Sequence, residues 1–549
     1  MTLRAMGRII RIWTAFLLFT VGCSAWGADD FPSQGAVVAA QPAAAQAGVA
    51  MLEAGGNAFD AAAATALALG VVEPGSSGLG GGGFFLLYIA KQHRFVMIDG
   101  RESSPQLAGH GEIYQRKSSI DGPQSAGVPG LLAAVARMQQ HYGKLPRADT
   151  VAPAIHLATK GFTVTPRLRR MLDWRKDVLN PAAKRLFLSG NRIRQPALAQ
   201  VLRRYAKFGK DDFYRGQTAG RMVADMQRDG GLIRLEDLAG YRAKERRPVV
   251  FHWHGYRVVS AALPSSGGMV LKEIFGMMQH DDLMAMDRAD RTHLLIEAMQ
   301  RAYRDRNRFL GDSDQVTIPS HLLNPIRLAK LRQSIDMAHT TPSAELGKST
   351  EPAGNGRDTT HFSVIDRHGN MVAATLSINY GFGSGYVSPS TGILFNDEMD
   401  DFATRPGVPN AYGLVQGKAN AVAPGKRMLS SMTPTIIQGK RRTLILGTPG
   451  GSRIISMVLL TAVAFMRNQT PPESWVAAGR FHHQFLPDVV QFEPGALDAA
   501  MQKELRARGH RLQQVHSYGN MQAILWDRPS GVLTLLSDPR GEGEGVRQQ

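Results

Sequence analysis

The sequence predicts an α+β protein in which helices cover central β-structure, and three observations favour this fold class. Alanine-rich and amphipathic helical patterns fill much of the chain before residue 310. Two strand pairs with short turns follow at 361–378 and 435–447. Helical patterns at 453–465 and 497–508 come after the second pair. Strands mixed with helices in this way are typical of a layered helix–sheet–helix architecture.

The composition is that of an ordinary globular protein with a basic balance. Of 549 residues, 43% are hydrophobic and 20% are charged. Lys and Arg outnumber Asp and Glu by 64 to 46, which gives a formal net charge of +18. Such a charge attracts nucleic acid or other anionic partners, but no nucleic-acid-binding motif accompanies basic residues that look scattered. We therefore predict a generally basic, solvated surface and no nucleic-acid partner.

The first 25 residues have the features of an export signal. Three arginines precede the short apolar stretch 14–21, and small residues suited to cleavage follow it. This stretch is too short to span a bilayer as a helix. Removal of residues 1–25 would take away Cys23, the only cysteine, and with it all thiol chemistry. The sequence predicts a periplasmic or secreted protein, with lipid anchoring at Cys23 as the less favoured alternative.

The first structural segments should be two helices and a strand. Residues 41–72 are predicted to form two alanine-rich helices with a break at 55–57 and Asp60 in the first turn of the second helix. A glycine-rich run then leads into a strand at 84–89. Its segment 78–83 matches GxGxxG, but a dinucleotide site needs a strand before the glycines and a helix after them. The order here is the reverse, so we predict a closely packed loop and no cofactor.

Helical spacing of apolar residues continues through the middle of the chain, at 153–159, 197–205 and 292–309. One strand is expected at 251–260, with His252 and His254 on one of its faces. A third metal ligand is missing nearby in the sequence, so ordinary sheet histidines are the better interpretation, and the same holds for His482–His483. We predict no metal site.

Residues 338–358 form the best boundary in the chain, because they are rich in Thr, Pro, Ser, Gly and charge and lack periodicity. A hairpin centred near His368 follows this boundary. Residues that face each other in a hairpin have numbers that sum to twice that of its centre, so Thr359 should face Ser377. Because side chains alternate along a strand, Asn379 should share the face of Ser377. A plain solvent-facing surface would fit the same pattern.

The stretch 443–453 is predicted to be a strand, a glycine turn and the start of a helix. Gly450 and Gly451 have no Cβ, so their N–H groups can approach a ligand at a helix N-terminus, where negative charge is favoured. This arrangement suits an oxyanion hole. The alternative is an ordinary helix start with Ser452 as its cap.

Several motifs together resemble the γ-glutamyltransferase family. The segments that carry the resemblance are 55–60, 80–84, 101–102, 264–268, 359–366, 396–402, 429–434 and 447–452. They run in the family's order from about Gly35 to the C-terminal region. The family belongs to the N-terminal-nucleophile hydrolases, so the resemblance implies a four-layer αββα sandwich.

The resemblance also implies self-cleavage between Asp358 and Thr359. A large subunit, 26–358, and a small subunit, 359–549, would then stay associated as a heterodimer. The Thr359 hydroxyl would be the nucleophile, and its newly freed α-amine would act as the base. His361 shares a strand face with Thr359, but we interpret it as structural because the amine lies closer.

The resemblance implies which of the remaining site residues would bind each charged group of a γ-glutamyl substrate. Arg101, Ser430 and Ser431 would bind its α-carboxylate, and Asn379, Glu398 and Asp401 its α-ammonium. Gly450 and Gly451 would hold the oxyanion, Ser377 would orient Thr359, and Tyr412 in the loop 404–420 would belong to a lid. Glu398 replaces a frequent Gln, and Ser377 a frequent Thr.

The implied partners are glutathione and other γ-glutamyl compounds as donors, with water, amino acids or dipeptides as acceptors. Two alternative functions remain open. One is a relative that acts on another acyl group, such as a cephalosporin acylase or a poly-γ-glutamate hydrolase. The other is a non-catalytic exported binding protein that uses the same pocket.

Overall fold

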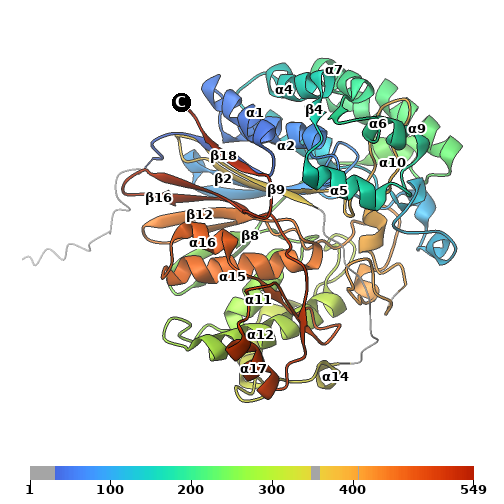
Figure 1. Cartoon of the computed structure of the whole chain (residues 1–549). Coiled ribbons are helices and arrows are strands. Elements are labelled where there is room, and N and C mark those ends of the chain that lie inside the picture. The colour runs from blue at the N-terminus through green and yellow to red at the C-terminus, as the bar shows by residue number, and fades with distance from the viewer. Residues whose placement is uncertain (1–30, 348–358, 406) are drawn as a thin grey trace, which may run out of the picture.

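Two β-sheets packed face to face form the core, and a layer of helices covers the outer face of each sheet (Figure 1). The structure is a computed structural model that describes residues 31–347, 359–405 and 407–549. The first sheet has the strand order β18-β1-β9-β10-β2-β3-β6, and the second has the order β17-β16-β12-β11-β8-β7. The predicted four-layer αββα sandwich is confirmed.

The strands of both sheets pair antiparallel throughout. The first sheet consists of β1 (Ala36–Ala39), β2 (Gly82–Ile89), β3 (Arg94–Gly100), β6 (Lys244–Arg246), β9 (Thr360–Ile365), β10 (Met371–Ser377) and β18 (Glu544–Arg547). The second consists of β7 (Val249–Trp253), β8 (Tyr256–Ser260), β11 (Thr435–Gln438), β12 (Arg442–Gly447), β16 (Gln522–Asp527) and β17 (Leu533–Ser537). Smaller pairings join β4 (Phe162–Thr163) with β5 (Arg192–Ile193), and β13 (Phe481–His482) with β14 (Val490–Phe492) and β15 (Leu512–Gln514).

The helices fall into two groups, one on each side of the sandwich (Figure 1). Those on the side of the first sheet are α1 (Pro42–Glu53), α2 (Ala58–Val72), α3 (Leu131–Tyr142), α4 (Arg147–Lys160), α5 (Pro166–Arg175), α6 (Pro181–Phe187), α7 (Pro196–Phe208), α8 (Lys210–Tyr214), α9 (Gln217–Asp229) and α10 (Leu235–Gly240). Those on the side of the second are α11 (Gly267–Met277), α12 (Arg288–Phe309), α13 (Pro325–Gln333), α14 (Ser343–Leu346), α15 (Ile454–Arg467), α16 (Pro472–Ala477) and α17 (Ala499–Ala507).

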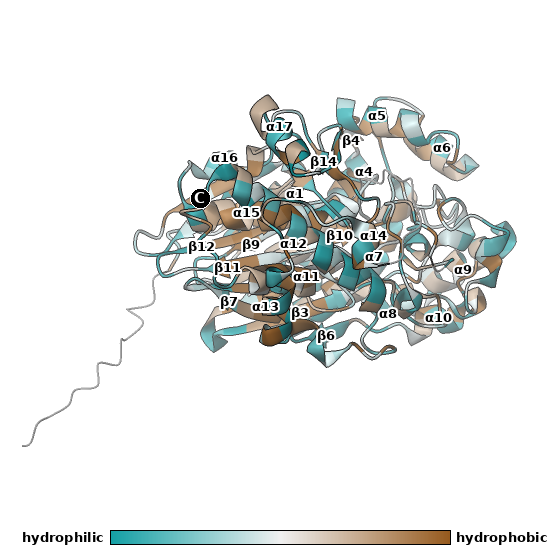
Figure 2. Cartoon of the chain, turned by 90° about the horizontal axis from the view of Figure 1, so that it is seen from below, coloured by the Kyte–Doolittle hydropathy of each residue, from teal (hydrophilic) through white to brown (hydrophobic). Residues whose placement is uncertain are grey.

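Three apolar layers hold these elements together. On β9, Val364 points into the cluster shared with the α1–α4 side, whereas its neighbour Ile365 points into the cluster between the sheets. On β12, Ile445 packs between the sheets and Leu444 packs toward α15. Figure 2 shows hydrophobic colour along the strands and on α15, with mixed or hydrophilic colour on outer helices such as α8. Strands buried on both faces read as continuous apolar runs rather than alternating ones.

The predicted break between the first two helices is confirmed. Gly55 has a φ of 86°, in the left-handed region that glycine tolerates. The Asn57 side chain accepts hydrogen bonds from the backbone of Phe59 and Asp60, while the Asp60 carboxylate accepts one from the Asn57 N–H at 3.0 Å. This reciprocal capping box fixes the start of α2.

The single strand predicted at 251–260 is wrong, because two strands, β7 and β8, occupy this segment. A two-residue turn joins them, with φ of 43° at His254 and 82° at Gly255. His252 therefore lies on a strand and His254 in a turn, so they do not share a strand face. The alternation of apolar residues resumes after the turn, so the periodicity of the sequence does not indicate that a turn is present.

Within the described residues, no helix is long and apolar enough to cross a membrane. The predicted export signal, residues 1–25, and the predicted cleavage residue Asp358 lie outside the described residues. Both remain predictions.

Candidate active site

Thr359 and Ser377 lie side by side at the open end of the β9–β10 hairpin. Thr360 is the Cα partner of Leu376, so one further step pairs Thr359 with Ser377. Oγ1 of Thr359 and Oγ of Ser377 are 3.3 Å apart, and both side chains are buried. The hairpin register predicted from the sequence is confirmed.

Asn379 reaches the same corner, but not by strand alternation as predicted. Its φ of 71° is left-handed, and the strand has already ended at Ser377. Its backbone N–H donates to Ser377 Oγ at 2.8 Å, and its side-chain amide donates to the carbonyl of Asp397 at 3.2 Å. These two bonds place Asn379 in the wall of the cavity beside Thr359.

An open cavity contains most of the predicted site residues; its volume of about 310 Å³ includes solvent at the mouth. Those in its wall are Arg101, Thr359, Ser377, Asn379, Asp401, Tyr412, Ser430, Ser431 and Gly451. Glu398 and Gly450 lie behind the wall, next to Arg101 and Gly451. A second cavity of about 320 Å³, which includes Glu73 and Arg167 in its wall, contains none of the predicted site residues.

The guanidinium of Arg101 is buried and is surrounded by carboxylates. Its Nη1 donates to Glu398 Oε2 at 2.5 Å and lies 3.5 Å from Glu102 Oε2, and its Nη2 donates to the Asp401 carboxylate. Residues 398–401 form a single 3₁₀ turn, which brings the Glu398 and Asp401 carboxylates to one side as predicted. Arg101 therefore neutralises only part of the negative charge that these three carboxylates can carry.

Burial decides the protonation of this cluster. It raises the pKa of Glu102 to about 7 and raises the pKa of Glu398 well above its ordinary value. The pKa of Arg101 rises further above its ordinary value despite burial, because three carboxylates surround it. Since one guanidinium faces two buried acids and the partly exposed Asp401, we infer that a carboxyl group of this cluster keeps its proton near neutral pH.

The glycine turn after β12 has no room for side chains. Gly450 and Gly451 have φ of 141° and 58°, and a Cβ on Gly451 would lie 2.3 Å from the ring of Tyr412. Ser452 does not cap the following helix, because its hydroxyl donates to Gln484 Oε1 at 2.7 Å. The alternative interpretation of Ser452 as a helix cap is therefore wrong.

The loop 404–420 places Tyr412 against the cavity. Only 7% of Tyr412 is exposed, and its hydroxyl donates to the carbonyl of Asn379 at 2.9 Å. The backbone N–H of Ala411 donates to the Asp400 carboxylate at 2.8 Å, which fixes the loop beside the 398–401 turn. Tyr412 therefore contacts both the glycine turn and the end of β10.

Comparison with known proteins identifies the family. A family model described as gamma-glutamyltranspeptidase matches residues 44–547. The chain belongs to the γ-glutamyltranspeptidase family. The glutathione hydrolase proenzyme of Pseudomonas sp. (strain A14) is 40% identical over 517 residues, which cover 90% of this chain and 89% of that protein.

Two solved structures share the fold of this γ-glutamyltranspeptidase family member. The crystal structure of cephalosporin acylase from Bacillus halodurans has a TM-score of 0.81 and 28% identity, covering 94% of this chain and 96% of that one. The crystal structure of Helicobacter pylori gamma-glutamyltranspeptidase has a TM-score of 0.54 and 35% identity, covering 56% of this chain and 93% of that one.

Arg306 is a cation in the wall of the γ-glutamyltranspeptidase cavity that the sequence analysis missed. It lies on α12, 1% exposed, and donates to hydroxyl groups of Ser266 and Ser431, each at 3.0 Å, and to Asn307 Oδ1 at 3.0 Å. Burial lowers its pKa to about 10, so it stays charged near neutral pH. Its direct hydrogen-bond partners among the described residues are neutral, which favours an anionic ligand beside it. Helical periodicity predicts α12 but not which of its arginines points inward.

Gln484 is a second residue that the sequence analysis missed. Its Oε1 accepts from Ser452, and its Nε2 donates to the carbonyl of Tyr412 at 3.2 Å. His482 lies behind it, with Nε2 3.0 Å from Gln484 Oε1, and burial lowers the pKa of His482 to about 3. Gln484 thereby joins the glycine turn to the loop that carries Tyr412. No motif in the sequence links these distant segments.

Proposed function

We propose that this protein is a γ-glutamyl hydrolase and transferase whose nucleophile is the hydroxyl of Thr359. One observation carries the proposal. In a member of the γ-glutamyltranspeptidase family, Thr359 immediately precedes β9, faces Ser377, and opens onto the cavity that holds Arg101 and Asp401. The curated relative named glutathione hydrolase proenzyme supports both the activity and a precursor form.

The nucleophile needs a base, and self-cleavage supplies one. The Thr359 hydroxyl attacks the carbonyl of Asp358, the peptide bond becomes an ester, and water opens the ester to leave Thr359 as a chain end. Its α-amine, with an ordinary pKa of about 7.7–8.0, then accepts the hydroxyl proton during catalysis. His361 is poorly suited to this role, because burial lowers its pKa to about 3 and its Nδ1 lies 2.8 Å from Thr375 Oγ1.

The buried ion cluster suits the zwitterionic end of a γ-glutamyl group. The substrate α-carboxylate takes a place on Arg101, with Ser430 and Ser431 as further donors, and the α-ammonium takes the carboxylates of Glu398 and Asp401 together with Asn379. Binding therefore exchanges internal ion pairs for substrate ion pairs, so no buried charge is left alone. A substrate lacking either charge would leave part of the cluster uncompensated.

The reaction proceeds through an acyl-enzyme. Attack of Thr359 on the γ-carbonyl forms a tetrahedral oxyanion, which the N–H groups of Gly450 and Gly451 stabilise. Ser377 holds the Thr359 hydroxyl in position. The amine of the leaving half departs with a proton, and a γ-glutamyl ester remains on Thr359. Water then yields glutamate, whereas an amino acid or dipeptide yields a new γ-glutamyl peptide.

The sheet topology supports a stable heterodimer of residues 26–358 and 359–549. In the first sheet, β9 and β10 of the small subunit lie between β1 and β2 of the large subunit. In the second sheet, β11 of the small subunit pairs with β8 of the large one. Separation of the two pieces would break strand pairs in both sheets. We also propose export to the periplasm or medium, guided by residues 1–25.

The deciding experiment compares Thr359→Ala with Thr359→Ser. We expect the alanine variant to stay one uncut chain with no turnover of a γ-glutamyl anilide, and the serine variant to yield two fragments and activity. The smaller wild-type fragment should begin at Thr359 on N-terminal sequencing. Normal processing of the alanine variant would refute the assignment.

The similarity to cephalosporin acylase from Bacillus halodurans favours one second candidate, an acylase for a related dicarboxylic acyl group. Such a substrate retains the scissile carbonyl and a distal carboxylate but has no α-ammonium. Turnover of glutathione and of a glutaryl-cephalosporin by the same preparation separates the two functions. Glu398 and Asp401 are the proposed partners of an α-ammonium, which glutathione has and a glutaryl group lacks. We therefore expect glutathione to be the better substrate.

A further inference from the structure

The positive charge of this protein is concentrated in one short part of the chain. Residues 160–210 contain 14 Lys and Arg, two Asp and no Glu, a formal charge of +12 out of +18 for the whole chain. Less than a tenth of the sequence therefore carries two thirds of its net charge. The expectation that the basic residues are evenly scattered is wrong.

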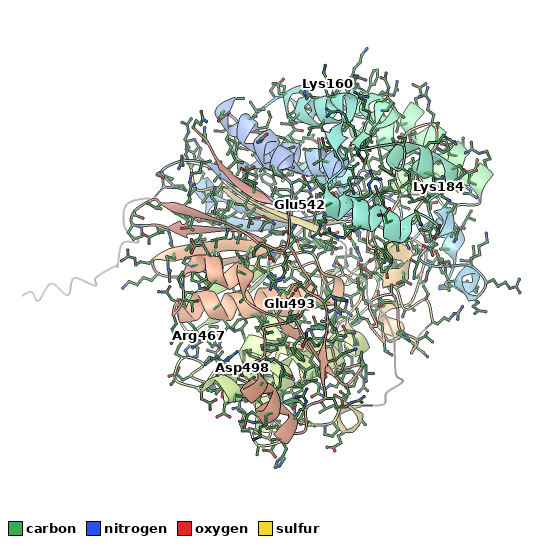
Figure 3. All side chains as sticks on the ribbon, in the orientation of Figure 1. Lys160, Lys184, Arg467, Glu493, Asp498 and Glu542 are labelled. Carbon is green, nitrogen blue, oxygen red and sulfur yellow. The ribbon has the colours of Figure 1, made fainter. Side chains whose placement is uncertain are left out.

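The basic residues of this segment lie on neighbouring helices and the loops between them, and we call this surface the basic face. It consists of Lys160, Arg167, Arg169, Arg170, Lys176, Lys184, Arg185, Arg192, Arg194, Arg203 and Lys207. These residues belong to α4, α5, α6, α7, the connection between α5 and α6, and the β4–β5 pair with its flanking loops. Figure 3 labels Lys160 and Lys184 at the outer edge of the molecule, over the helices at the top and upper right of Figure 1.

Three of these cations converge on the C-terminal end of α4. Arg192 donates to the carbonyls of Lys160 and Gly161 at 3.0 and 2.8 Å, and Arg194 donates to the Lys160 carbonyl at 3.4 Å. Arg203 donates to the hydroxyl of Thr159 at 3.0 Å. The carbonyl groups at a helix end hold these guanidinium groups in place while leaving other N–H groups for solvent or a ligand.

No carboxylate neutralises the basic face within the part of the chain that the structure describes. The ion pairs of residues 160–210 use three other cations, Arg175 with Asp121, Arg204 with Asp212 and Lys210 with Asp211. Like charges at this density repel one another and raise the local potential. An anionic partner would relieve that repulsion.

Exposed aromatic rings accompany the cations. Trp174 on α5 is 50% exposed and Phe208 at the end of α7 is 51% exposed. The cations of Arg204 and Lys207 lie 5.0 and 5.1 Å from the centre of the Phe208 ring. Cations beside exposed aromatic rings are typical of surfaces that lie in the headgroup region of a bilayer.

We propose that the basic face binds the anionic surface of a phospholipid bilayer. Its arginines and lysines contact lipid phosphates, and Trp174 and Phe208 enter the headgroup region. A polyanion such as nucleic acid would use the charges but would not need the exposed rings, which is why we favour lipid. None of the basic-face cations lines the Thr359 cavity, so binding through them does not depend on the proposed reaction.

The test measures binding of the purified full protein to phosphatidylcholine vesicles with and without phosphatidylglycerol, at low and high salt. The first variant replaces Arg170, Lys176, Lys184 and Arg185 by Gln, because these exposed side chains have no hydrogen bond or ion pair within the described residues. The matched control replaces four exposed cations elsewhere, Arg116, Lys330, Lys440 and Lys503, and changes the net charge equally. A third variant combines Trp174→Ala with Phe208→Ala.

We expect the wild type and the control to bind only the phosphatidylglycerol vesicles, with binding that weakens as salt rises. The basic-face variant should bind roughly tenfold or more weakly, and the aromatic variant should lose the part of binding that persists at high salt. γ-Glutamyl-anilide turnover should be the same in the wild type, the basic-face variant and its control. Equal weakening in the basic-face variant and the control would overturn the proposal. The proposal would also be overturned if the wild type bound duplex DNA but not the vesicles and the basic-face variant lost the DNA binding.

Discussion

At the scale of single residues, the cavity has two buried arginines, one with charged hydrogen-bond partners and one with neutral partners. Arg101 faces the carboxylates of Glu102, Glu398 and Asp401, whereas the direct partners of Arg306 are hydroxyl and amide groups. The Ser431 hydroxyl accepts from Arg306 and lines the cavity, so it has its own proton free to donate to a substrate carboxylate. Arg306 is thus placed to position Ser431, which we propose binds the substrate carboxylate.

We predict that Arg306→Gln raises KM for γ-glutamyl substrates more than it lowers kcat. Loss of a hydrogen bond from a charged group costs about 1.5–3 kcal/mol, which corresponds to roughly 10- to 100-fold in kcat/KM. Arg306→Lys should recover part of the loss, because the charge remains. The control is Arg308→Gln, an exposed arginine on the same helix. Equal KM values for the wild type and Arg306→Gln would contradict the role of Arg306.

Gln484 is a second single residue whose change should affect the reaction, here through the glycine turn and not through the carboxylate-binding residues. Because Gln484 binds both Ser452 and the Tyr412 carbonyl, Gln484→Ala should loosen the glycine turn that we propose holds the oxyanion. We predict a roughly tenfold or larger fall in kcat with little change in KM, because the turn contacts charge that develops after substrate binding. Steady-state kinetics of this variant and of the exposed control Gln513→Ala provide the measurement. A rise in KM at unchanged kcat would show that Gln484 serves binding instead.

Some of these residues follow from local patterns in the sequence and others do not, for a physical reason. Thr359 and Ser377 could be paired because the numbers of residues that face each other across a hairpin have a constant sum. Arg306 and Gln484 reach the site from α12 and from a loop, across separations that no local pattern records. The roles of Arg101 and Asp401 came only from the family resemblance.

At the scale of elements, α12 buries charged groups as well as apolar ones. Glu297 and Arg301 are both fully buried and form an ion pair at 2.7 Å. Glu297 also accepts from the Thr340 hydroxyl at 2.6 Å, and Arg301 donates to the Ser334 carbonyl at 2.8 Å. This pair therefore attaches the segment after α13 to the helix that carries Arg306.

We predict that Glu297→Ala lowers the free energy of unfolding by about 3–5 kcal/mol, because Arg301 would keep its charge in the interior without a counter-ion. Thermal and denaturant unfolding measure the effect, with the exposed Glu345→Ala as control. The double variant with Glu297→Ala and Arg301→Met should be more stable than the single one, since it removes the isolated charge. A single variant as stable as the control would show that the pair contributes nothing.

At the scale of the whole molecule, the helix boundaries were easier to predict than the stacking of the two sheets. Capping residues and apolar spacing locate α1, α2, α7 and α12. Pairings such as β1 with β9 and β8 with β11 join strands far apart in the sequence. The turn between β7 and β8 was missed because a two-residue turn leaves the alternating pattern intact. The sequence of a strand that is buried on both faces does not indicate which of the two sheets the strand joins.

His361 lies where the two sheets meet, and it gives the sandwich a measurable pH dependence. A Cβ on Gly447 of the second sheet would lie 2.3 Å from the His361 ring, and Ser363 Oγ lies 3.3 Å from Nε2. Burial lowers the pKa of His361 to about 3, below the value of about 6.5 for an unfolded chain. Between pH 3 and pH 6.5 this histidine is protonated in the unfolded chain but neutral in the folded protein. Its contribution to stability therefore falls as the pH falls below about 6.5.

His361→Gln should therefore be destabilising above about pH 7, where both states of the wild type are neutral. The difference from the wild type should shrink by up to about 1.4 kcal/mol for each pH unit below about 6, because glutamine has no such proton to bind. Other groups with shifted pKa values contribute equally to both proteins, so the difference between them isolates His361. The control His368→Gln changes an exposed histidine in the hairpin turn and should show no such trend. A pH-independent difference between His361→Gln and the wild type would mean that the ring takes up a proton in the folded sandwich.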